Sequence, residues 1–133
     1  MAVDPVRIVI ETFESAFKDF ELPASCIAIV DSNGLSLHTT GACPSLELFE
    51  GILGGIISAF ERLRESLKAS FNEVVSLITI ELEEFSYYVD DIPNTDLYLV
   101  ARTRKDLLFK AYPFLANVAN TLHQLALAKD LQE

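Results

Sequence analysis

The sequence predicts a single α/β domain of the α+β type, in which helices sandwich a five-stranded antiparallel sheet. Apolar residues recur at helical spacing in three segments and alternate or run together in five short ones. The first two short segments are joined by a tight-turn signal, which is typical of an antiparallel hairpin. The length of 133 residues suits one domain, so we expect a single unit over 1–133 with the order α-β-β-α-β-β-β-α.

The first segment, about residues 4–20, has the signals of an amphipathic helix. Asp4 can serve as N-cap, Pro5 takes the favoured first helical position, and Pro23 ends the segment. The expected apolar face comprises Val6, Val9, Ile10, Phe13, Phe17 and Phe20.

Residues 26–39 predict a β-hairpin. An apolar strand over 26–30 is followed by Asn33-Gly34, a pair able to take the positive φ angles of a tight turn, and then by an alternating strand over 35–39.

A long helix is predicted over about 45–70, and its centre carries no charge between Ile52 and Ala59. A surface helix normally shows a polar back, so the centre should be covered on more than one side. Gly51, Gly54 and Gly55 each cost up to about 1 kcal/mol relative to Ala in a helix interior. Close approach of another backbone would explain them, and a helix break near 51–55 is the alternative.

The second half of the chain predicts strands over 73–82, 84–89 and 96–101, with a turn over 90–95. One helical turn is expected over 106–111, and Pro113 should lie in the first turn of a second helical segment. The expected apolar face of that last segment is Phe114, Leu115, Val118, Leu122, Leu125 and Ala126.

Charge and targeting signals narrow the classes of partner. The net charge of −10 disfavours nucleic acid and anionic membranes. No apolar run approaches the ~18 residues of a membrane span, and no signal peptide is visible. We therefore expect a cytoplasmic protein with no direct membrane insertion. No disulfide is expected, because Cys26 fits a small buried apolar position and Cys43 a loop.

No motif predicts catalysis, a cofactor or a metal. The glycines at 51–55 lack the lysine and the preceding strand of a phosphate-binding loop. His38 and His123, taken with the two cysteines, match no zinc spacing. An acidic group is interpreted as a solvated sheet edge: Glu81, Glu83, Glu84, Asp90, Asp91 and Asp96. We therefore expect a protein that is not an enzyme.

The order of elements resembles the roadblock family, named after a dynein light chain and including bacterial and archaeal regulators of small GTPases. The resemblance rests on the helix leading into Ile27–Leu35, the central helix around 52–67, the strand block 73–101 and the closing helix. Three glycines in the central helix depart from the family pattern. The resemblance implies a non-enzymatic dimer, homodimeric or with a paralogous chain, that binds a Ras-like small GTPase as a scaffold or regulator.

In this family the central helices pack together and a strand pairs with its copy. The dimer-interface residues that this implies are Ile52, Leu53, Ile56, Ile57, Phe60, Leu63, Val75, Leu77 and Thr79. The candidate partner-binding residues are Glu61, Arg62, Arg64, Glu65 and Lys68, which also fit an ordinary solvated helix end. Two alternatives remain open: a longin-like adaptor, and a profilin-like or PAS-like ligand-sensing module.

Overall fold

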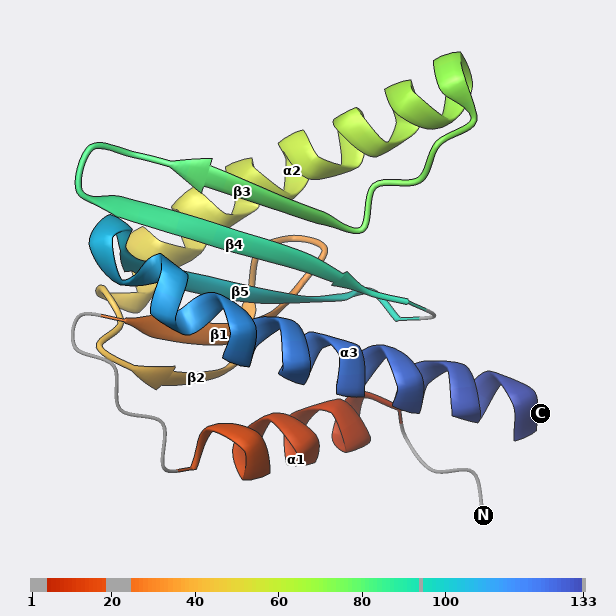
Figure 1. Cartoon of the computed structure of the whole chain (residues 1–133), viewed down its shortest axis with the longest axis horizontal. Helices are drawn as coiled ribbons and strands as arrows, with labels where there is room; N and C mark the ends of the chain where they lie inside the picture. Colours follow the sequence, from red (N-terminus) through yellow and green to blue (C-terminus); the bar gives the residue numbers. More distant parts are fainter. Residues whose placement is uncertain (1–4, 19–24, 94, 133) are drawn as a thin grey trace.

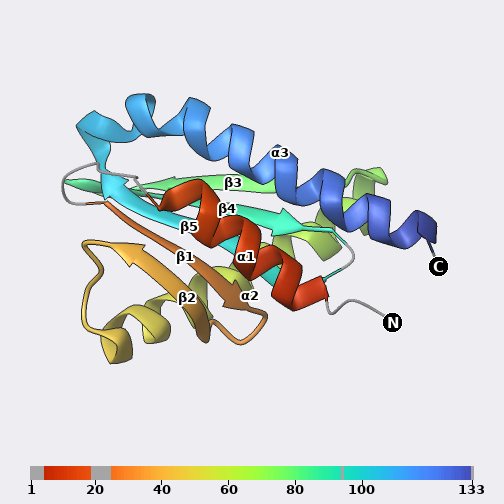
Figure 2. The same cartoon turned by 90° about the horizontal axis from the view of Figure 1, so that it is seen from below.

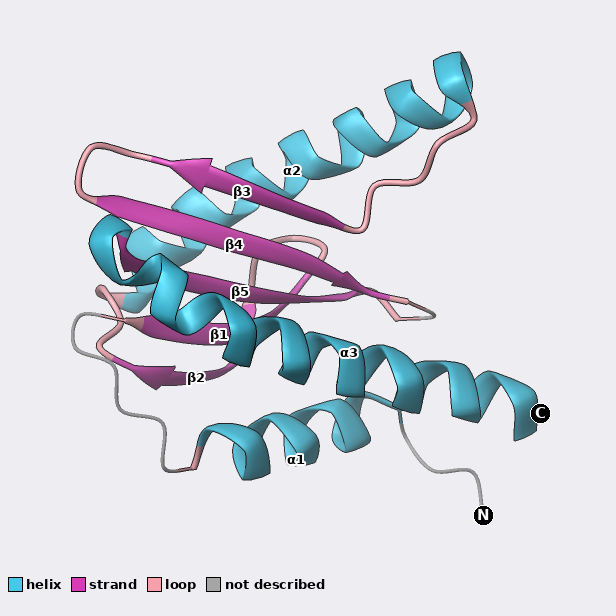
Figure 3. Ribbon diagram, in the orientation of Figure 1, coloured by secondary structure: helices cyan, strands magenta, loops and turns pink. Residues whose placement is uncertain are grey.

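The computed structural model describes residues 5–18, 25–93 and 95–132 and shows a five-stranded antiparallel sheet between helices (Figures 1 and 3). The strands are β1 (Cys26–Asp31), β2 (Ser36–Gly41), β3 (Leu77–Glu81), β4 (Phe85–Ile92) and β5 (Leu97–Arg104). The helices are α1 (Pro5–Phe17), α2 (Leu46–Phe71), the short 3-10 helix η1 (Lys105–Leu107) and α3 (Leu108–Gln132). The strand order is β2-β1-β5-β4-β3, so β2 and β3 form the two edges.

The sheet separates two apolar cores. Helices α1 and α3 cover one face of the sheet and α2 covers the other (Figure 2). Because side chains alternate along a strand, Ile27 and Ile29 of β1 pack toward α1 and α3, while Ala28 and Val30 pack toward α2. The predicted fold class and element order are confirmed.

The β1–β2 hairpin forms as predicted, but its turn differs in detail. Gly34 has a positive φ of 84°, whereas Asn33 does not adopt positive φ. The Asp31 carboxylate accepts hydrogen bonds from the backbone N–H groups of Asn33 and Leu35, at 2.9 and 3.0 Å. The Gly34 N–H also donates to the Asp31 carbonyl at 3.0 Å, so the predicted turn over 31–34 is present, and only the positive φ expected at Asn33 is missing.

Helix α2 is continuous, so the alternative of a break at 51–55 is wrong. It ends at Asn72, which has a φ of 54° and donates from its N–H to the Lys68 carbonyl at 3.0 Å. Its C-terminal end projects beyond β3 (Figure 1). The chain uses residues 73–76 to return to the sheet, and β3 therefore starts at Leu77 rather than at the predicted residue 73.

Strands β4 and β5 are longer than predicted. Asp90 and Asp91 lie within β4, where they pair with Leu99 and Tyr98 of β5, and do not form the expected turn. Asp90 is only 5% exposed, so its interpretation as part of a solvated edge is wrong. Strand β5 continues to Arg104 instead of ending at residue 101.

The last helix is also longer than predicted. Helix α3 runs from Leu108 without the expected interruption, and Pro113 lies inside it. The proline falls in the second turn, where its missing N–H removes one backbone hydrogen bond close to the helix start.

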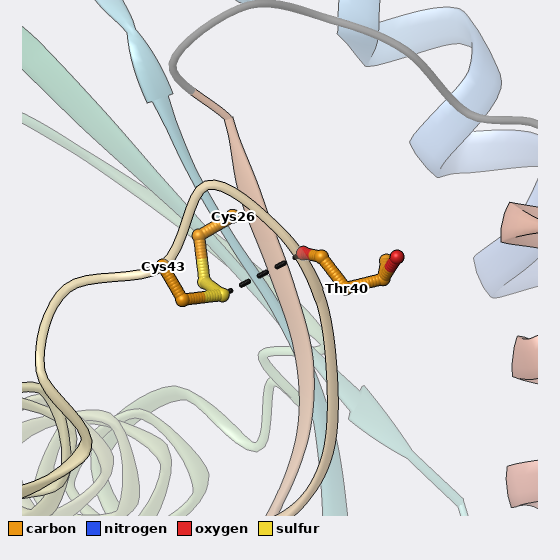
Figure 4. The surroundings of a disulfide bond; sticks show 3 residues. All are labelled: Cys26, Thr40 and Cys43. Atoms are coloured by element: carbon orange, nitrogen blue, oxygen red, sulfur yellow. Dashed lines mark hydrogen bonds between the residues drawn. A yellow bond between two sulfur atoms is a disulfide. The ribbon is translucent and has the colours of Figure 1, made fainter.

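A disulfide joins Cys26 and Cys43, with 4.7 Å between their Cα atoms, so the expectation of unlinked cysteines is wrong (Figure 4). Cys26 is fully buried in the core beneath α2, and Cys43 lies in the loop before that helix. Closing a loop of this size stabilises a folded protein by about 3 kcal/mol. The expected cytoplasmic location rested partly on the absence of a disulfide, and it stays a prediction.

Some expectations lie outside the described residues. They are the N-cap at Asp4, Phe20, the stop at Pro23, and the side chains of Val6, Leu125 and Ala126.

Candidate interaction surface

Helix α2 presents an uncharged outer face to solvent. Phe49, Leu53, Ile57 and Phe60 are fully buried against the sheet. The opposite face includes Leu48 and Ile52, which are 68% and 50% exposed, and then the small exposed residues Gly51, Gly55, Ser58 and Ala59. Charged residues normally occupy the solvent side of an amphipathic helix. A continuous uncharged face of this kind is typical of a protein-interaction surface.

The three glycines of α2 have two different explanations. Gly54 packs against the β1–β2 turn, and a Cβ on Gly34 would lie only 2.6 Å from the Gly54 Cα. The backbone that approaches this glycine therefore belongs to the same chain. A Cβ on Gly51 or Gly55 would meet no atom within 4 Å among the described residues. The fold of one chain does not require these two glycines, which lie one turn apart on the outer face.

Strand β3 leaves one edge of the sheet open. The Asp91 N–H donates to the Ser76 carbonyl at 2.9 Å, and the Leu82 N–H donates to the Phe85 carbonyl at 2.8 Å. Hydrogen-bonded residues alternate along an antiparallel pair, so the backbone groups of Leu77 and Thr79 point away from β4. Such an edge can accept another strand.

The nine predicted dimer-interface residues divide into three groups. Ile52, Leu63 and Thr79 are exposed, and Ile56, Val75 and Leu77 are partly buried. Leu53, Ile57 and Phe60 are fully buried in the core of their own chain, so they hold α2 on the sheet and present no surface to a partner.

The five predicted partner-binding residues divide into two groups. Arg62, Glu65 and Lys68 are exposed. Arg64 pairs with Asp91 at 3.0 Å, and its guanidinium lies 4.9 Å from the centre of the Phe60 ring. Glu61 accepts a hydrogen bond from the Tyr98 hydroxyl at 3.0 Å. Burial, followed by the Glu61 carboxylate, raises the pKa of Tyr98 to about 12. Glu61 and Arg64 are thus engaged within the chain.

Asp91 faces α2, and its environment also favours the neutral carboxyl. Burial raises the pKa of Asp91, and the neighbouring Arg64 offsets only part of this effect.

A polar network on the other face of the sheet was not predicted. The Tyr88 hydroxyl donates to Asp90 at 3.0 Å, and the Nε2 atom of His123 lies 2.9 Å from the other Asp90 oxygen. Burial raises the pKa of Asp90, against the opposing effects of His123 and Tyr88. Burial also raises the pKa of Tyr88. The alternation of Tyr88 and Asp90 could have placed both on one strand face, but the Asp-Asp-Ile-Pro sequence favours a turn.

The residues considered for metal binding do not come together. His38 lies 3.5 Å from Glu14, His123 contacts Asp90, and the two cysteines are bonded to each other. Over the part of the chain that the structure describes, no three His, Cys, Asp or Glu side chains are placed to hold a metal ion. No helix in the same part is long and apolar enough to cross a membrane.

Two surface hollows bear on the ligand-sensing alternative. The smaller, about 220 Å³, lies between α1 and β2 beside Phe13 and His38. Ligand pockets usually measure about 300–1,000 Å³. The larger, about 630 Å³, is open to solvent, and every residue lining it except Phe85 is charged. Neither has the enclosed apolar lining of a small-molecule site.

Comparison with solved structures identifies the roadblock fold. The chain superposes on an MglB described as having a tetrameric arrangement with a TM-score of 0.68 and 16% identity, covering 97% of this chain and 95% of that one. The gliding protein MglB from Thermus thermophilus gives 0.67 and 15%, covering 95% and 93%. A Roadblock/LC7 domain from Streptomyces avermitilis gives 0.60 and 14%, covering 86% and 93%. No protein-family model and no curated protein matches the sequence.

Proposed function

We propose that this chain is a non-enzymatic, self-associating scaffold or regulator that binds a Ras-like small GTPase in the cytoplasm. The observation that carries the proposal is the uncharged, glycine-containing outer face of α2 on a roadblock fold. The proposal follows the function that the family resemblance implies. Fold alone does not fix function, so the proposal rests on the surfaces of this chain as well as on its fold.

Self-association through α2 and β3 would cover the uncharged outer face of α2 and pair the open edge of β3 in one interface. A second chain joined along the open edge of β3 would extend the sheet. The end of α2 projects beyond β3, so it would then lie over the sheet of the second chain (Figure 1). Phe71 and Val74, which are 68% and 71% exposed, would gain cover there. Gly51 and Gly55 would allow two helix backbones to approach closely.

We assign the binding of the partner GTPase to the exposed charged side chains on the second half of α2. Arg62, Glu65 and Lys68 are free of the intrachain contacts that engage Glu61 and Arg64. In this proposal any nucleotide hydrolysis belongs to the GTPase, and the residues that the structure describes show no convergent catalytic set at this surface.

Sedimentation of Ile52→Glu tests the self-association. Ile52 is half exposed, so a carboxylate there leaves the core intact but places charge in the proposed interface. We expect a wild-type dimer and a monomeric variant. Phe109→Glu is the matched control, because Phe109 is 77% exposed on α3, on the other side of the sheet. A wild-type monomer, or equal dissociation of both variants, would contradict the proposed interface.

GTPase binding is tested with purified Ras-like GTPases from the same genome, loaded with GDP or a non-hydrolysable GTP analogue. Reversing charge with Arg62→Glu and Lys68→Glu should weaken binding by at least about tenfold, while Lys110→Glu on α3 should not. If every GTPase fails to bind to a wild-type dimer, the regulator proposal is wrong even though the dimer stands.

A further inference from the structure

The Cys26–Cys43 disulfide connects the sheet to the entrance of α2. Cys26 begins β1, and Cys43 lies two residues after β2 and three residues before the first residue of α2. The Ala42 N–H donates to the Ser25 carbonyl at 2.7 Å, which keeps this loop beside the start of β1. Figure 4 shows the bond between strand and loop.

The start of α2 has few other attachments. Ser45, at the N-cap position, makes no side-chain capping hydrogen bond. Leu46, Glu47 and Leu48 are exposed, so Phe49 is the first residue of the helix that packs into the core. The next contact is one residue later, where the Ser36 N–H donates to the Glu50 carboxylate at 2.7 Å. The disulfide is thus the covalent tie that precedes these contacts.

We propose that this disulfide is a redox-sensitive clamp on the start of α2, and that reducing it loosens the helix entrance and weakens self-association. The clamp stands on the disulfide and its surroundings. Its coupling to self-association rests on the proposed function, because Leu48, Gly51 and Ile52 of the proposed interface follow Cys43 within about three helical turns.

A dithiol reductant can open the bond at Cys43. Cys26 is fully buried, whereas Cys43 is only partly buried, so a thiolate of the dithiol attacks the Cys43 sulfur. The sulfur–sulfur bond to Cys26 breaks, the Cys26 thiolate takes up a proton, and a mixed disulfide with Cys43 remains. The second thiol of the reductant displaces Cys43, which also takes up a proton. Two electrons and two protons move from the dithiol, which leaves as its own disulfide.

The reduced state has a contact ready for one of the two thiols. The Cys43 sulfur lies 3.6 Å from the Thr40 carbonyl oxygen, a contact drawn as a dashed line in Figure 4. A disulfide sulfur carries no proton to donate, whereas the Cys43 thiol could donate a weak hydrogen bond to this carbonyl. The Cys43 thiol produced by reduction therefore has an acceptor within reach, while the Cys26 thiol stays buried in the core beneath α2.

Hydrogen exchange of the full chain tests the clamp directly. Amides 45–52 are compared between the oxidised protein and the protein reduced with dithiothreitol, with amides 58–66 of the same helix as the internal reference. We expect exchange at 45–52 to rise by about tenfold or more on reduction, with a smaller change at 58–66. Alkylation of both thiols, detected by mass, verifies each redox state. Cys26→Ala with Cys43→Ala is the matched control and should not respond to the reductant.

The same samples are then sedimented. We expect the dimer dissociation constant to rise by about tenfold on reduction, and to stay constant in the double variant. Unchanged exchange at 45–52, or free thiols in the oxidised protein, overturns the clamp. Faster exchange with an unchanged dimer overturns the coupling. A chain that is monomeric in both states overturns the proposed self-association, while the exchange at 45–52 still decides the clamp.

Discussion

At the scale of single residues, Gly34 and Gly55 show how differently one residue type is used. Gly34 has a φ of 84°, and a Cβ on it would overlap the backbone of Gly54. Gly55 is helical, exposed and faces open space. The first glycine is required by the fold of one chain and the second is not.

Alanine at these two positions should therefore have opposite effects. Gly34→Ala should lower the free energy of unfolding by about 3 kcal/mol, through backbone strain and overlap. Gly55→Ala should raise it by up to about 1 kcal/mol, because alanine favours the helix. Urea unfolding in the Ile52→Glu background measures both without a contribution from self-association. Destabilisation by Gly55→Ala in that background would show that the single chain does require this glycine.

Asp90 gives a residue-scale prediction about pH. Burial raises its folded-state pKa above the ordinary value of 3.8, so the folded protein holds this proton more tightly than the unfolded chain. As the pH rises from about 3.8 through the folded-state pKa, ionisation of Asp90 lowers the free energy of unfolding, and the loss is constant above that pKa. Asn at position 90 does not ionise.

The unfolding free energy of Asp90→Asn, minus that of the wild type, should consequently increase with pH over this interval. Urea unfolding between pH 4 and 7 provides the measurement. The exposed Asp96→Asn controls for the loss of one negative charge. A difference that decreases with pH would mean that the contact with His123 outweighs the cost of burying the carboxylate.

The residues that the sequence misplaces are those whose partners are far away in the chain. Asp90 looked like a turn residue because local propensity favours a turn, but His123, 33 residues later, gives it a buried partner. The disulfide also depends on distance in space, because the separation of 17 residues says nothing about whether the two Cβ atoms meet.

At the scale of elements, the periodicity of apolar residues predicts an element best where the pattern within that element alone determines which face is buried. The long helix was predicted at 45–70 and is observed as Leu46–Phe71, because its apolar face repeats over many turns. Strand ends were less predictable. The observed extension of β5 to Arg104 depends on pairing with Phe85, which is a contact between two elements.

The candidate surface was predictable only in part. The uncharged centre of α2 indicated two-sided cover, but the sequence could not separate Ile52, which is exposed, from Ile57, which is buried. Apolar residues around the whole helix share the same hydropathy, and only the packing of α2 on the sheet distinguishes its two sides.

The two edge strands offer a matched test of sheet extension. Thr79 on β3 and Thr39 on β2 are both exposed, and both direct their backbone N–H away from the neighbouring strand. Proline at either position removes no hydrogen bond within the chain. Thr79→Pro should abolish self-association, whereas Thr39→Pro should leave it within about threefold of the wild type. Sedimentation measures both. Equal dimerisation of the two variants would show that pairing along β3 does not contribute to self-association.

At the scale of the whole molecule, a net charge of −10 accompanies a mean hydropathy of +0.30. A small domain has little interior, so some of this apolar content must lie on the surface. The structure places part of it on the outer face of α2, at Leu48, Ile52 and Leu63. A net charge of one sign opposes association of two copies, so the proposed self-association should become tighter as salt screens this repulsion.

If folding and association are linked, the melting temperature should depend on protein concentration. A ligand that binds only the folded state stabilises it by mass action, and a second copy of the chain acts as such a ligand. A tenfold rise in concentration should raise the Tm of the wild type by about 2–3 °C for a domain of this size. Ile52→Glu should lose this dependence, because its core is unchanged and only the exposed face of α2 is altered. Differential scanning calorimetry at several concentrations measures the effect, and Phe109→Glu should retain it. A wild-type Tm that is independent of concentration would mean that each chain is stable alone and that the outer face of α2 is free to meet a different partner.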